Sequence, residues 1–435
     1  MRKWNFSAGP ATIPESVLKE TQSELLEFKS TGMSVMEMSH RSKDYGEIAN
    51  AARDDLIELL DVPDSHDVLF LQGGATLQFG LIPMNFAHLG IPESVLKETQ
   101  SELLEFKPTG MSVMEMSHRS KDYGEIANAA RDDLIELLDV PDSHDVLFLQ
   151  GGATLQFGLI PMNFAHLGIP EYLETGTWST KAIKECSKVC DLNICASSVE
   201  SNFTNVPELT DWKFRSSNGY FHYVANETIQ GNAIHDVPSV ENPIIADLSS
   251  VILAEPIDVS KFSMIYAGAQ KNIGPAGLTI AIISKDLLSS CNKDIPNIMN
   301  YDKHAQSGSM LNTPPTFAWY MAGKVFKWLK SLGGLEAVKE RNYLKASTLY
   351  DFIDRSDFYS NPVAKNNRSI MNIPFILKSP DLDSTFLKEA ESENLLNLKG
   401  HRSVGGMRAS IYNAMPQEAI DDLIAFMEAF ESKYG

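Results

Sequence analysis

Polar side chains stand at the ends of three apolar runs, where a folded chain could use them for chemistry. Lys271 follows MIYAGAQ, Asp247 ends NPIIAD, and Thr228 follows YFHYVANE. In open α/β sheets ligands bind at the carboxyl ends of the strands, so these residues are candidates for one site. A lysine that burial deprives of water loses its proton more readily, which suits attack on a carbonyl carbon. Lys271 therefore predicts Schiff-base chemistry.

A glycine-rich turn and a tryptophan extend this set of residues. GGAT follows the apolar run HDVLFLQ and places Ala153 and Thr154 at the start of an expected helix, where backbone N–H groups can hold a phosphate. Trp178, in TGTWSTKA, could stack on a flat ring. A phosphate, a ring with a protonated nitrogen and an amine-reactive carbonyl together describe pyridoxal phosphate, the predicted cofactor. Each residue alone has an ordinary structural explanation, so the prediction depends on their conjunction.

A second group of candidates is cationic. GHRSVGGMRAS contains His401, Arg402 and Arg408 around two glycines, and SHRSKD contains Arg41 at its first occurrence and Arg119 at its second. Arginine binds carboxylate and phosphate through two parallel hydrogen bonds. A salt-bridged surface cluster is the alternative explanation. The glycines favour a ligand site, because they let the backbone approach a ligand closely.

Apolar runs and helical patterns alternate along the chain, which is typical of an α/β fold with a mostly parallel sheet. Turn or glycine signals bound the expected strands, which cover residues 144–150, 220–226, 242–250, 263–270 and 277–284. A smaller α+β unit is expected at the C-terminal end, with strands near residues 369–377 and 406–413 and a final helix over 418–432. We therefore expect the sheet to bring Lys271, Asp247 and Thr228 together. The smaller unit would place Arg402 and Arg408 next to these residues.

One segment of the chain occurs twice. Residues 13–90 recur as residues 91–168, and the one difference is Pro108 in place of Ser30. Solenoid repeats are shorter and drift in sequence, so we infer a tandem duplication of a first and a second repeat copy. Either copy could complete the fold, and the copy left outside would expose apolar faces that favour aggregation.

The expected organisation has four parts: an N-terminal arm over residues 1–12, the first copy over 13–90, a large cofactor-binding domain over 91–334 and a small C-terminal domain over 335–435. Trp178 follows the second copy directly, which favours that copy as the one in the fold. The working residues would then be Ala153, Thr154 and Arg119, in place of Ala75, Thr76 and Arg41 of the first copy. A splice of both copies stays open, because the arm runs straight into the first copy.

Charge and composition narrow the class of protein. The net charge of −20 over 435 residues argues against nucleic acid and anionic membranes as partners. An anionic substrate would therefore need a local cationic site. The apolar stretches are shorter than a signal peptide core or a membrane span requires. Four cysteines are too few for a disulfide framework, so a cytoplasmic protein without a metal is expected.

With one copy set aside, nearly the whole chain resembles the phosphoserine aminotransferases, which are fold-type I, class V pyridoxal-phosphate enzymes of serine biosynthesis. The motifs are NFSAGPA, SVMEMSHRS, GTWSTKA, NETIQG, AGAQKNIGPAGLT, NTPPTF and KGHRSVGGMRAS. The resemblance implies that Lys271 forms the Schiff base, Asp247 pairs with the pyridine nitrogen and Trp178 stacks on the ring. It implies further cofactor contacts from Thr228, Gln270, Ala153 and Thr154, or Ala75 and Thr76, and from Asn312 and Thr313 of the neighbour in a homodimer.

The resemblance also implies the substrates. Arg408 would hold the substrate α-carboxylate, and His401 and Arg402 would hold its phosphate or the glutamate side chain, together with Arg119 or Arg41. Glutamate would donate its amino group to 3-phosphooxypyruvate, giving 2-oxoglutarate and O-phosphoserine; the 4-phosphooxythreonine pair of vitamin B6 synthesis stays open. The alternatives are another class V aminotransferase and an inactive or misassembled homologue, because of the repeat.

Overall fold

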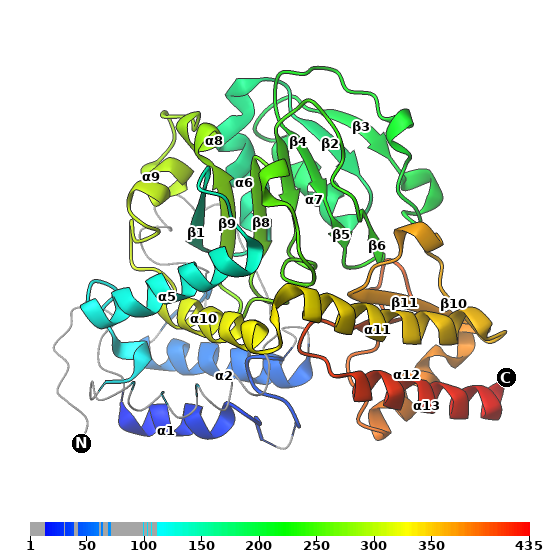
Figure 1. Cartoon of the computed structure of the whole chain (residues 1–435). Helices are drawn as coiled ribbons and strands as arrows, with labels where there is room; N and C mark the ends of the chain where they lie inside the picture. Colours follow the sequence, from blue (N-terminus) through cyan, green and yellow to red (C-terminus); the bar gives the residue numbers. More distant parts are fainter. Residues whose placement is uncertain are drawn as a thin grey trace.

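The computed structural model of the chain describes residues 14–29, 31–38, 42–60, 62–63, 68–70, 99, 102, 106 and 111–435. Figure 1 shows a large sheet in the upper part of the molecule and a smaller unit at the lower right, with the first helices of the chain at the bottom. No helix in these ranges combines the length and the apolar character that crossing a bilayer demands. Ala75, Thr76 and Arg41 lie outside the described residues.

The large sheet has seven strands in the order β1-β9-β8-β7-β4-β2-β3. They are β1 (His144–Gln150), β9 (Leu278–Ser284), β8 (Met264–Gly268), β7 (Ile244–Asp247), β4 (Phe221–Val224), β2 (Glu171–Glu174) and β3 (Asn193–Ser197). β9 runs antiparallel to both of its neighbours, and the other pairs are parallel. The predicted α/β fold with a mostly parallel sheet is therefore confirmed.

Helices cover both faces of this sheet. Along β1, Val146 and Phe148 belong to one apolar core, whereas Leu147 and Leu149 belong to another. Successive side chains of a strand point to opposite faces, so these are the cores on the two faces of the sheet. The first core includes α5 (Lys121–Leu138) and α10 (Thr316–Ser331), and the second includes α6 (Ala153–Phe164), α7 (Thr177–Cys186), α8 (Lys285–Ser289) and part of α9 (Tyr301–Gln306).

The C-terminal unit has its own apolar core. Its antiparallel sheet contains β10 (Tyr359–Ser360), β11 (Asn372–Leu377) and β12 (Met407–Ser410), with α11 (Gly334–Arg355), α12 (Asp383–Ser392) and α13 (Gln417–Tyr434) packed around it. A two-stranded ribbon, β5 (Asn226–Glu227) and β6 (Asn232–Ala233), lies between the two units (Figure 1). The division at residue 334 stays a prediction.

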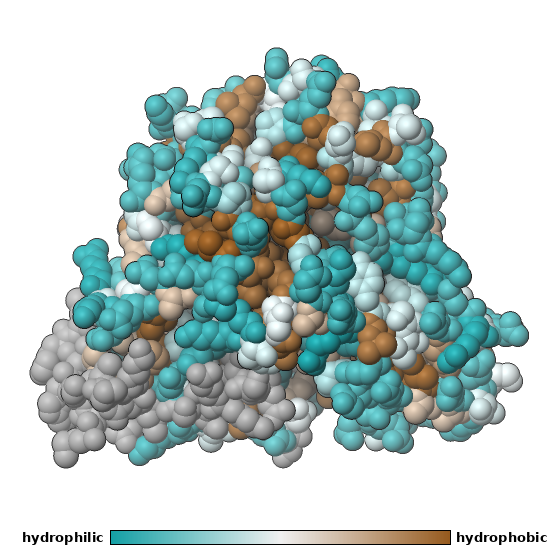
Figure 2. Space-filling model, in the orientation of Figure 1, coloured by the Kyte–Doolittle hydropathy of each residue, from teal (hydrophilic) through white to brown (hydrophobic). Residues whose placement is uncertain are grey.

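The described part of the first repeat copy contains two helices, α1 (Glu15–Glu24) and α2 (Lys43–Leu60). Leu18 and Leu25, at α1 and just after it, are buried, whereas α2 contains no buried residue. α2 has the same sequence as α5, which buries one face against α10. In Figure 2 the surface of the drawn face is mostly hydrophilic, with apolar side chains gathered near its middle.

Candidate active site

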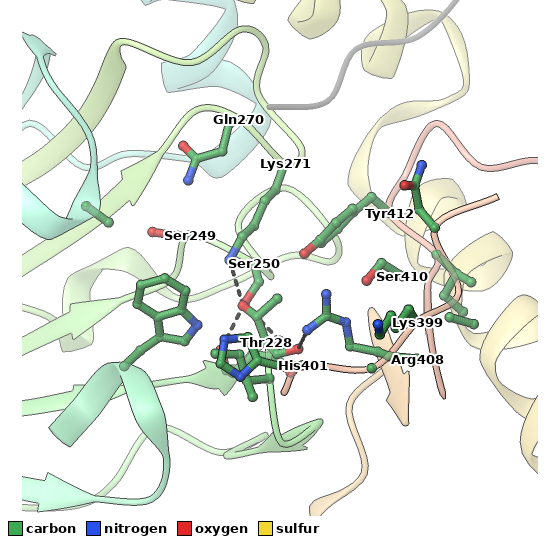
Figure 3. Close-up of a pocket in the computed structure, with 18 of the residues that line it drawn as sticks. Thr228, Ser249, Ser250, Gln270, Lys271, Lys399, His401, Arg408, Ser410 and Tyr412 are labelled. Atoms are coloured by element: carbon green, nitrogen blue, oxygen red, sulfur yellow. Dashed lines mark hydrogen bonds between the residues drawn. The ribbon is translucent and has the colours of Figure 1, made fainter. Parts of the chain in front are cut away.

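A cavity of about 1220 Å³ lies where the strand ends of the large sheet face the small sheet. It is lined by ten of the residues that the sequence singles out: Ala153, Thr154, Trp178, Thr228, Asp247, Gln270, Lys271, His401, Arg402 and Arg408. Figure 3 shows Lys271, from above, and Arg408, from the right, both pointing toward Thr228. The cavity therefore joins the cofactor candidates to most of the cationic candidates.

Lys271 projects into this cavity from a turn just after β8. Its Nζ donates a hydrogen bond to Thr228 Oγ1 at 2.6 Å (Figure 3). Burial lowers the pKa of Lys271 to about 8; the Asp247 carboxylate opposes this shift, and the Arg408 guanidinium adds to it. A fraction of Lys271 is therefore a neutral amine near neutral pH, as a nucleophilic lysine requires.

Asp247 is the last residue of β7, and it is buried beside the lysine. Its Oδ1 accepts a hydrogen bond from Ser249 N at 2.8 Å, and Ser249 Oγ accepts one from Gly268 N at 3.0 Å. These bonds tie the ends of β7 and β8 together and fix the carboxylate. Burial raises the pKa of Asp247, while its hydrogen bonds with Ser249 and the charge of Lys271 oppose that shift.

A buried carboxylate that the sequence analysis did not single out positions Trp178. Glu227 accepts hydrogen bonds from Trp178 N at 2.9 Å and from Ser179 N at 2.8 Å, so it caps the first turn of α7. Gly176 allows this approach, because a Cβ there would lie 2.4 Å from Glu227 Cδ. Burial raises the pKa of Glu227 to about 7, and the two N–H donors oppose the shift. Its place in NETIQG, next to Thr228, was a usable signal.

The start of α6 forms the end of the cavity that suits a phosphate. Gly151 has a φ of +103°, and Gly152 precedes the first helical residue, so the N–H groups of Ala153 and Thr154 have no acceptor within the helix. Nearby, a Cβ on Gly268 would lie 2.6 Å from Gln270 Oε1 and 3.2 Å from Ala153 N. The backbones approach closely here because position 268 is glycine.

The fit of an aromatic cofactor can be tested on Trp178. Its ring lines the cavity, its Nε1 is buried without a hydrogen-bond partner among the described residues, and Lys271 Nζ lies 5.9 Å from the ring centroid. A flat ring, a carboxylate and an amine therefore border one space next to a helix N-terminus. This set of groups fits a phosphorylated pyridine aldehyde.

The cationic side of the cavity belongs to β12 and the loop before it. Arg408 Nη1 donates to Thr228 O at 3.2 Å, and His401 Nδ1 lies 2.7 Å from Ser403 Oγ. Gly400 permits the tight loop, because a Cβ there would lie 2.1 Å from Gly405 O. Lys399 and Tyr412 line the same region (Figure 3). Lys399 begins the motif KGHRSVGGMRAS and Tyr412 lies just after it, yet their types alone gave no signal.

Three predicted residues do not line the cavity of their own chain. Arg119 of the second copy is exposed, and Asn312 and Thr313 also lie outside the lining. The Thr313 carbonyl instead accepts a hydrogen bond from Gln150. The lining does include Glu37, Met38 and Ser42 of the first copy, which the sequence analysis did not propose.

The comparisons with known proteins agree with this site. A family model described as aminotransferase class V matches residues 3–91 and 89–423. The chain therefore belongs to the class V aminotransferases.

Relatives narrow this assignment. The chain is 50% identical over 345 residues to the phosphoserine aminotransferase of Hahella chejuensis, which covers 79% of this chain and 96% of the relative. It is 51% identical over 348 residues to that of Acinetobacter baylyi, covering 79% of this chain and 97% of the relative. Within its class, the chain is a member of the phosphoserine aminotransferases.

Solved structures give the same result for the fold. The phosphoserine aminotransferase from Bacillus circulans subsp. alkalophilus matches with a TM-score of 0.78 and 44% identity, covering 80% of this chain and 97% of that chain. The pyridoxal-phosphate-bound phosphoserine aminotransferase from Trichomonas vaginalis matches with a TM-score of 0.74 and 40% identity, covering 78% of this chain and 97% of that chain.

Proposed function

We propose that the chain transfers the amino group of glutamate to 3-phosphooxypyruvate, giving 2-oxoglutarate and O-phosphoserine. One observation supports this most strongly: a single cavity contains Lys271 and Asp247 on one side and Arg402 and Arg408 on the other. An amine on a strand end suits amino-group transfer, and the arginines suit a substrate with both a carboxylate and a phosphate. The names of relatives about 50% identical support the same reaction.

We propose pyridoxal phosphate as the cofactor. When bound, it would supply an aldehyde for the amino group and a protonated ring that withdraws electrons from the substrate Cα. Asp247 would keep the ring nitrogen protonated, Trp178 would lie against the ring, and Thr228 would face the ring oxygen. The N–H groups of Ala153 and Thr154, together with Gln270, would hold the phosphate.

Lys271 would perform the proton transfers. Its lowered pKa leaves part of the side chain neutral, so Nζ would be able to hold the cofactor aldehyde and to accept a proton from the substrate Cα. The hydrogen bond to Thr228 Oγ1 aims the amine along the cavity. The nearby Asp247 carboxylate stabilises the ammonium that proton acceptance creates.

The arginine side would orient the substrates. We propose that Arg408 holds the α-carboxylate, because it lines the cavity and donates to Thr228 O, while Lys271 donates to Oγ1 of the same threonine. His401 and Arg402 would hold the phosphate of one substrate or the side-chain carboxylate of the other. Such a local cationic group lets a chain with a net charge of −20 bind anions.

We further propose a cytoplasmic homodimer with shared active sites. Arg119, Asn312 and Thr313 would serve the cavity of the partner subunit, since none of them lines the cavity of its own chain. The apolar side chains near the middle of the face in Figure 2 support an interface, because large exposed apolar patches mark association sites. The 4-phosphooxythreonine reaction of vitamin B6 synthesis would use the same groups.

The alternatives have less support. An inactive homologue is not supported, since the described residues at the strand ends of the large sheet retain the amine, the carboxylate and the stacking ring. An alanine–glyoxylate-type aminotransferase of class V would have no use for a second arginine, because its substrates carry no phosphate and no side-chain carboxylate. We also infer that the repeat is a tandem duplication, since matches that cover 96% of a relative leave part of this chain unmatched.

A substrate panel tests the proposal. The full-length chain, loaded with pyridoxal phosphate, should lose its yellow colour with phosphoserine and keep it with alanine. Lys271→Ala should lower the turnover with phosphoserine by at least about 100-fold, in the range of a general acid–base group. Lys388→Ala, on the exposed surface of α12 and outside the cavity lining, is the control and should leave turnover nearly unchanged. Equal rates with phosphoserine and alanine would exclude the proposed substrate.

The pKa of Lys271 gives a second readout. Because burial lowers this pKa to about 8, attachment of the cofactor to the cofactor-free protein should accelerate as the pH rises through 8 and level off above it. The neutral amine is the attacking form, which fixes the direction. Stopped-flow absorbance measures this rate, and a rate that falls as the pH rises would contradict the role of Lys271.

A further inference from the structure

Two of the four cysteines lie next to each other at the end of α7. Cys186 is the last residue of α7 and is buried, whereas Cys190, in the turn that follows, is partly exposed. Their sulfur atoms lie 3.6 Å apart, and Cys190 N donates to Cys186 O at 3.0 Å, so one helical turn holds both residues. This thiol pair lies outside the lining of the cavity that contains Lys271.

Tyrosine hydroxyls lie near the buried sulfur. Tyr220 OH is 3.8 Å from Cys186 Sγ, and Tyr172 OH is 3.0 Å from Tyr220 OH. The hydrogen bond from Cys190 lowers the pKa of Cys186 to about 7, with help from the hydroxyls of Tyr172 and Tyr220 and against the effect of burial. The same bond raises the pKa of Cys190. The pair therefore loses its first proton readily, and the two sulfurs then share the second.

The other two cysteines are not arranged for such chemistry. Cys195 and Cys291 are both buried, and Cys195 Sγ donates to the carbonyl oxygen of Tyr172 at 3.2 Å. Burial raises the pKa of Cys195 to about 12 and that of Cys291 to about 11. Because the thiolate is the reactive form, buried cysteines with a raised pKa are inert. Cys195 and Cys291 are therefore internal controls for the pair.

The turn between Cys186 and Cys190 can bring the two sulfurs together. A disulfide bond is about 2.0 Å long, so the sulfurs would have to approach each other by about 1.6 Å. Residues 187–189, which form the turn, are exposed. A small shift of this turn therefore displaces few packed side chains.

We propose that Cys186 and Cys190 are a redox-active thiol pair, which hydrogen peroxide converts to a reversible disulfide. Cys190 is the sulfur that peroxide reaches, because Cys186 is buried. When the shared proton lies on Cys186, the Cys190 thiolate attacks one oxygen of the peroxide and the O–O bond breaks. The hydroxide that leaves takes the proton from Cys186 and becomes water.

The second step closes the disulfide. The Cys186 thiolate attacks the sulfur of the Cys190 sulfenic acid, and the S–O bond breaks. The hydroxide that leaves takes up the proton that the pair released at the start. Two thiols thus lose two electrons to one peroxide, which becomes two water molecules. No step depends on the transamination proposed above.

Thiol counting and peptide mapping of the full-length chain test the proposal. After a small molar excess of hydrogen peroxide, a thiol reagent in denaturant should detect two of the four thiols, and all four again after dithiothreitol. Trypsin cleaves after Lys184, Lys188 and Lys213, so the disulfide should join the peptide 185–188 to the peptide 189–213. Intact mass under non-reducing conditions shows whether the link lies within one chain.

Two serine variants identify the partner, since the peptide 189–213 contains both Cys190 and Cys195. Cys190→Ser should abolish the link and leave its three thiols unoxidised, whereas the matched control Cys195→Ser should keep the link. A link that persists in Cys190→Ser would overturn the proposal. A link only between two chains, or peroxide consumption without any linked peptide, would overturn it as well.

The tyrosine hydroxyl gives a kinetic test. Tyr220→Phe should slow the loss of thiols at pH 7 about two- to fivefold, because the pair then forms less thiolate. Tyr223→Phe, a change in a buried tyrosine on the opposite face of the sheet, is the matched control and should leave the rate unchanged. Equal rates in the two variants would contradict the activation of the thiol pair by Tyr220.

Discussion

α2 and α5 share the eighteen-residue sequence KDYGEIANAARDDLIELL, yet they occupy different environments. α5 buries Tyr123, Ala127, Ala130, Leu134 and Leu138, whereas α2 buries nothing. The contrast is clearest at the last position, where Leu138 is 2% exposed and Leu60 is 66% exposed. The sequence specifies an amphipathic helix in both places, but it does not specify what covers the apolar face.

The different burial of α5 and α2 comes from α10, the helix against which α5 packs. α10 offers one groove, where a Cβ on Gly323 would lie 2.9 Å from Ala130 Cβ and where Tyr123 meets Trp319 edge to face. A close-packed interior has no second place for an identical helix. One copy therefore fills the groove, and the apolar face of the other is only partly covered, with Tyr45 and Leu56 half-buried and Leu60 exposed.

Truncating the last leucine of each helix should give the largest difference in stability between α5 and α2. Leu138→Ala should lower the free energy of unfolding by about 2–5 kcal/mol, because it leaves a cavity in the core. Leu60→Ala should change it by less than about 0.5 kcal/mol, as exposed substitutions do. Urea titration followed by tryptophan fluorescence measures both.

The double variant shows whether the copies exchange. If α2 can replace a damaged α5, Leu138→Ala alone will cost little and Leu60→Ala/Leu138→Ala will cost the full amount. We expect instead that the double variant matches Leu138→Ala, because α5 is joined directly to β1 by a short connection. A strongly non-additive pair would contradict the fixed assignment of α5 to the groove.

Removing one tyrosine hydroxyl should give an intermediate difference in stability between α5 and α2. Tyr123 OH donates to Thr316 O at 3.2 Å in the core, so Tyr123→Phe should cost about 1 kcal/mol in the same urea titration. Tyr45→Phe, the matched change in α2, should cost less, since Tyr45 is only partly buried. Equal costs would mean that both tyrosines sit in equivalent sites.

Removing a charged side chain should give the smallest difference in stability between α5 and α2. Lys330 of α10 pairs with Asp133 at 2.8 Å and with Glu136 at 2.6 Å, and these partners raise the pKa of the lysine. Asp133→Asn should cost at most about 1 kcal/mol, and less at high salt. A raised lysine pKa stabilises the fold at neutral pH, and this contribution is lost as the pH rises through it. Asp55→Asn, in exposed α2, should cost less at every pH; an equal cost would contradict the contrast.

The strands that the sequence revealed are those with continuous apolar runs. Residues 144–150 are β1 as predicted, and β9 begins one residue inside its predicted run. β2 escaped notice because EYLE is only four residues long and has a glutamate at each end. Glu171 can be buried there because it accepts hydrogen bonds from Arg215 N at 2.8 Å and Ser216 N at 2.9 Å. Such compensation comes from distant residues and leaves no local signal.

The site was predictable for a related reason. Residues that end neighbouring parallel strands must meet at one edge of the sheet, so Asp247 and Lys271 could be placed together from their positions alone. The role of Glu227 could not be predicted in this way, since it depends on where α7 packs, and the presence of Glu37 in the cavity lining depends on where the first copy packs. The repeat shows this limit of sequence analysis most clearly. Its two copies have the same local sequence, yet they lie in different environments.

The distance along the chain between α5 and α10 has a consequence for synthesis on the ribosome. Both α2 and α5 precede Thr316–Ser331, so both have emerged before the groove of α10 exists. Domains fold as units while the chain emerges from its N-terminal end, but here neither copy gains from arriving first. The groove is filled only when α10 emerges, and α5 is then the copy that the short connection to β1 holds beside it.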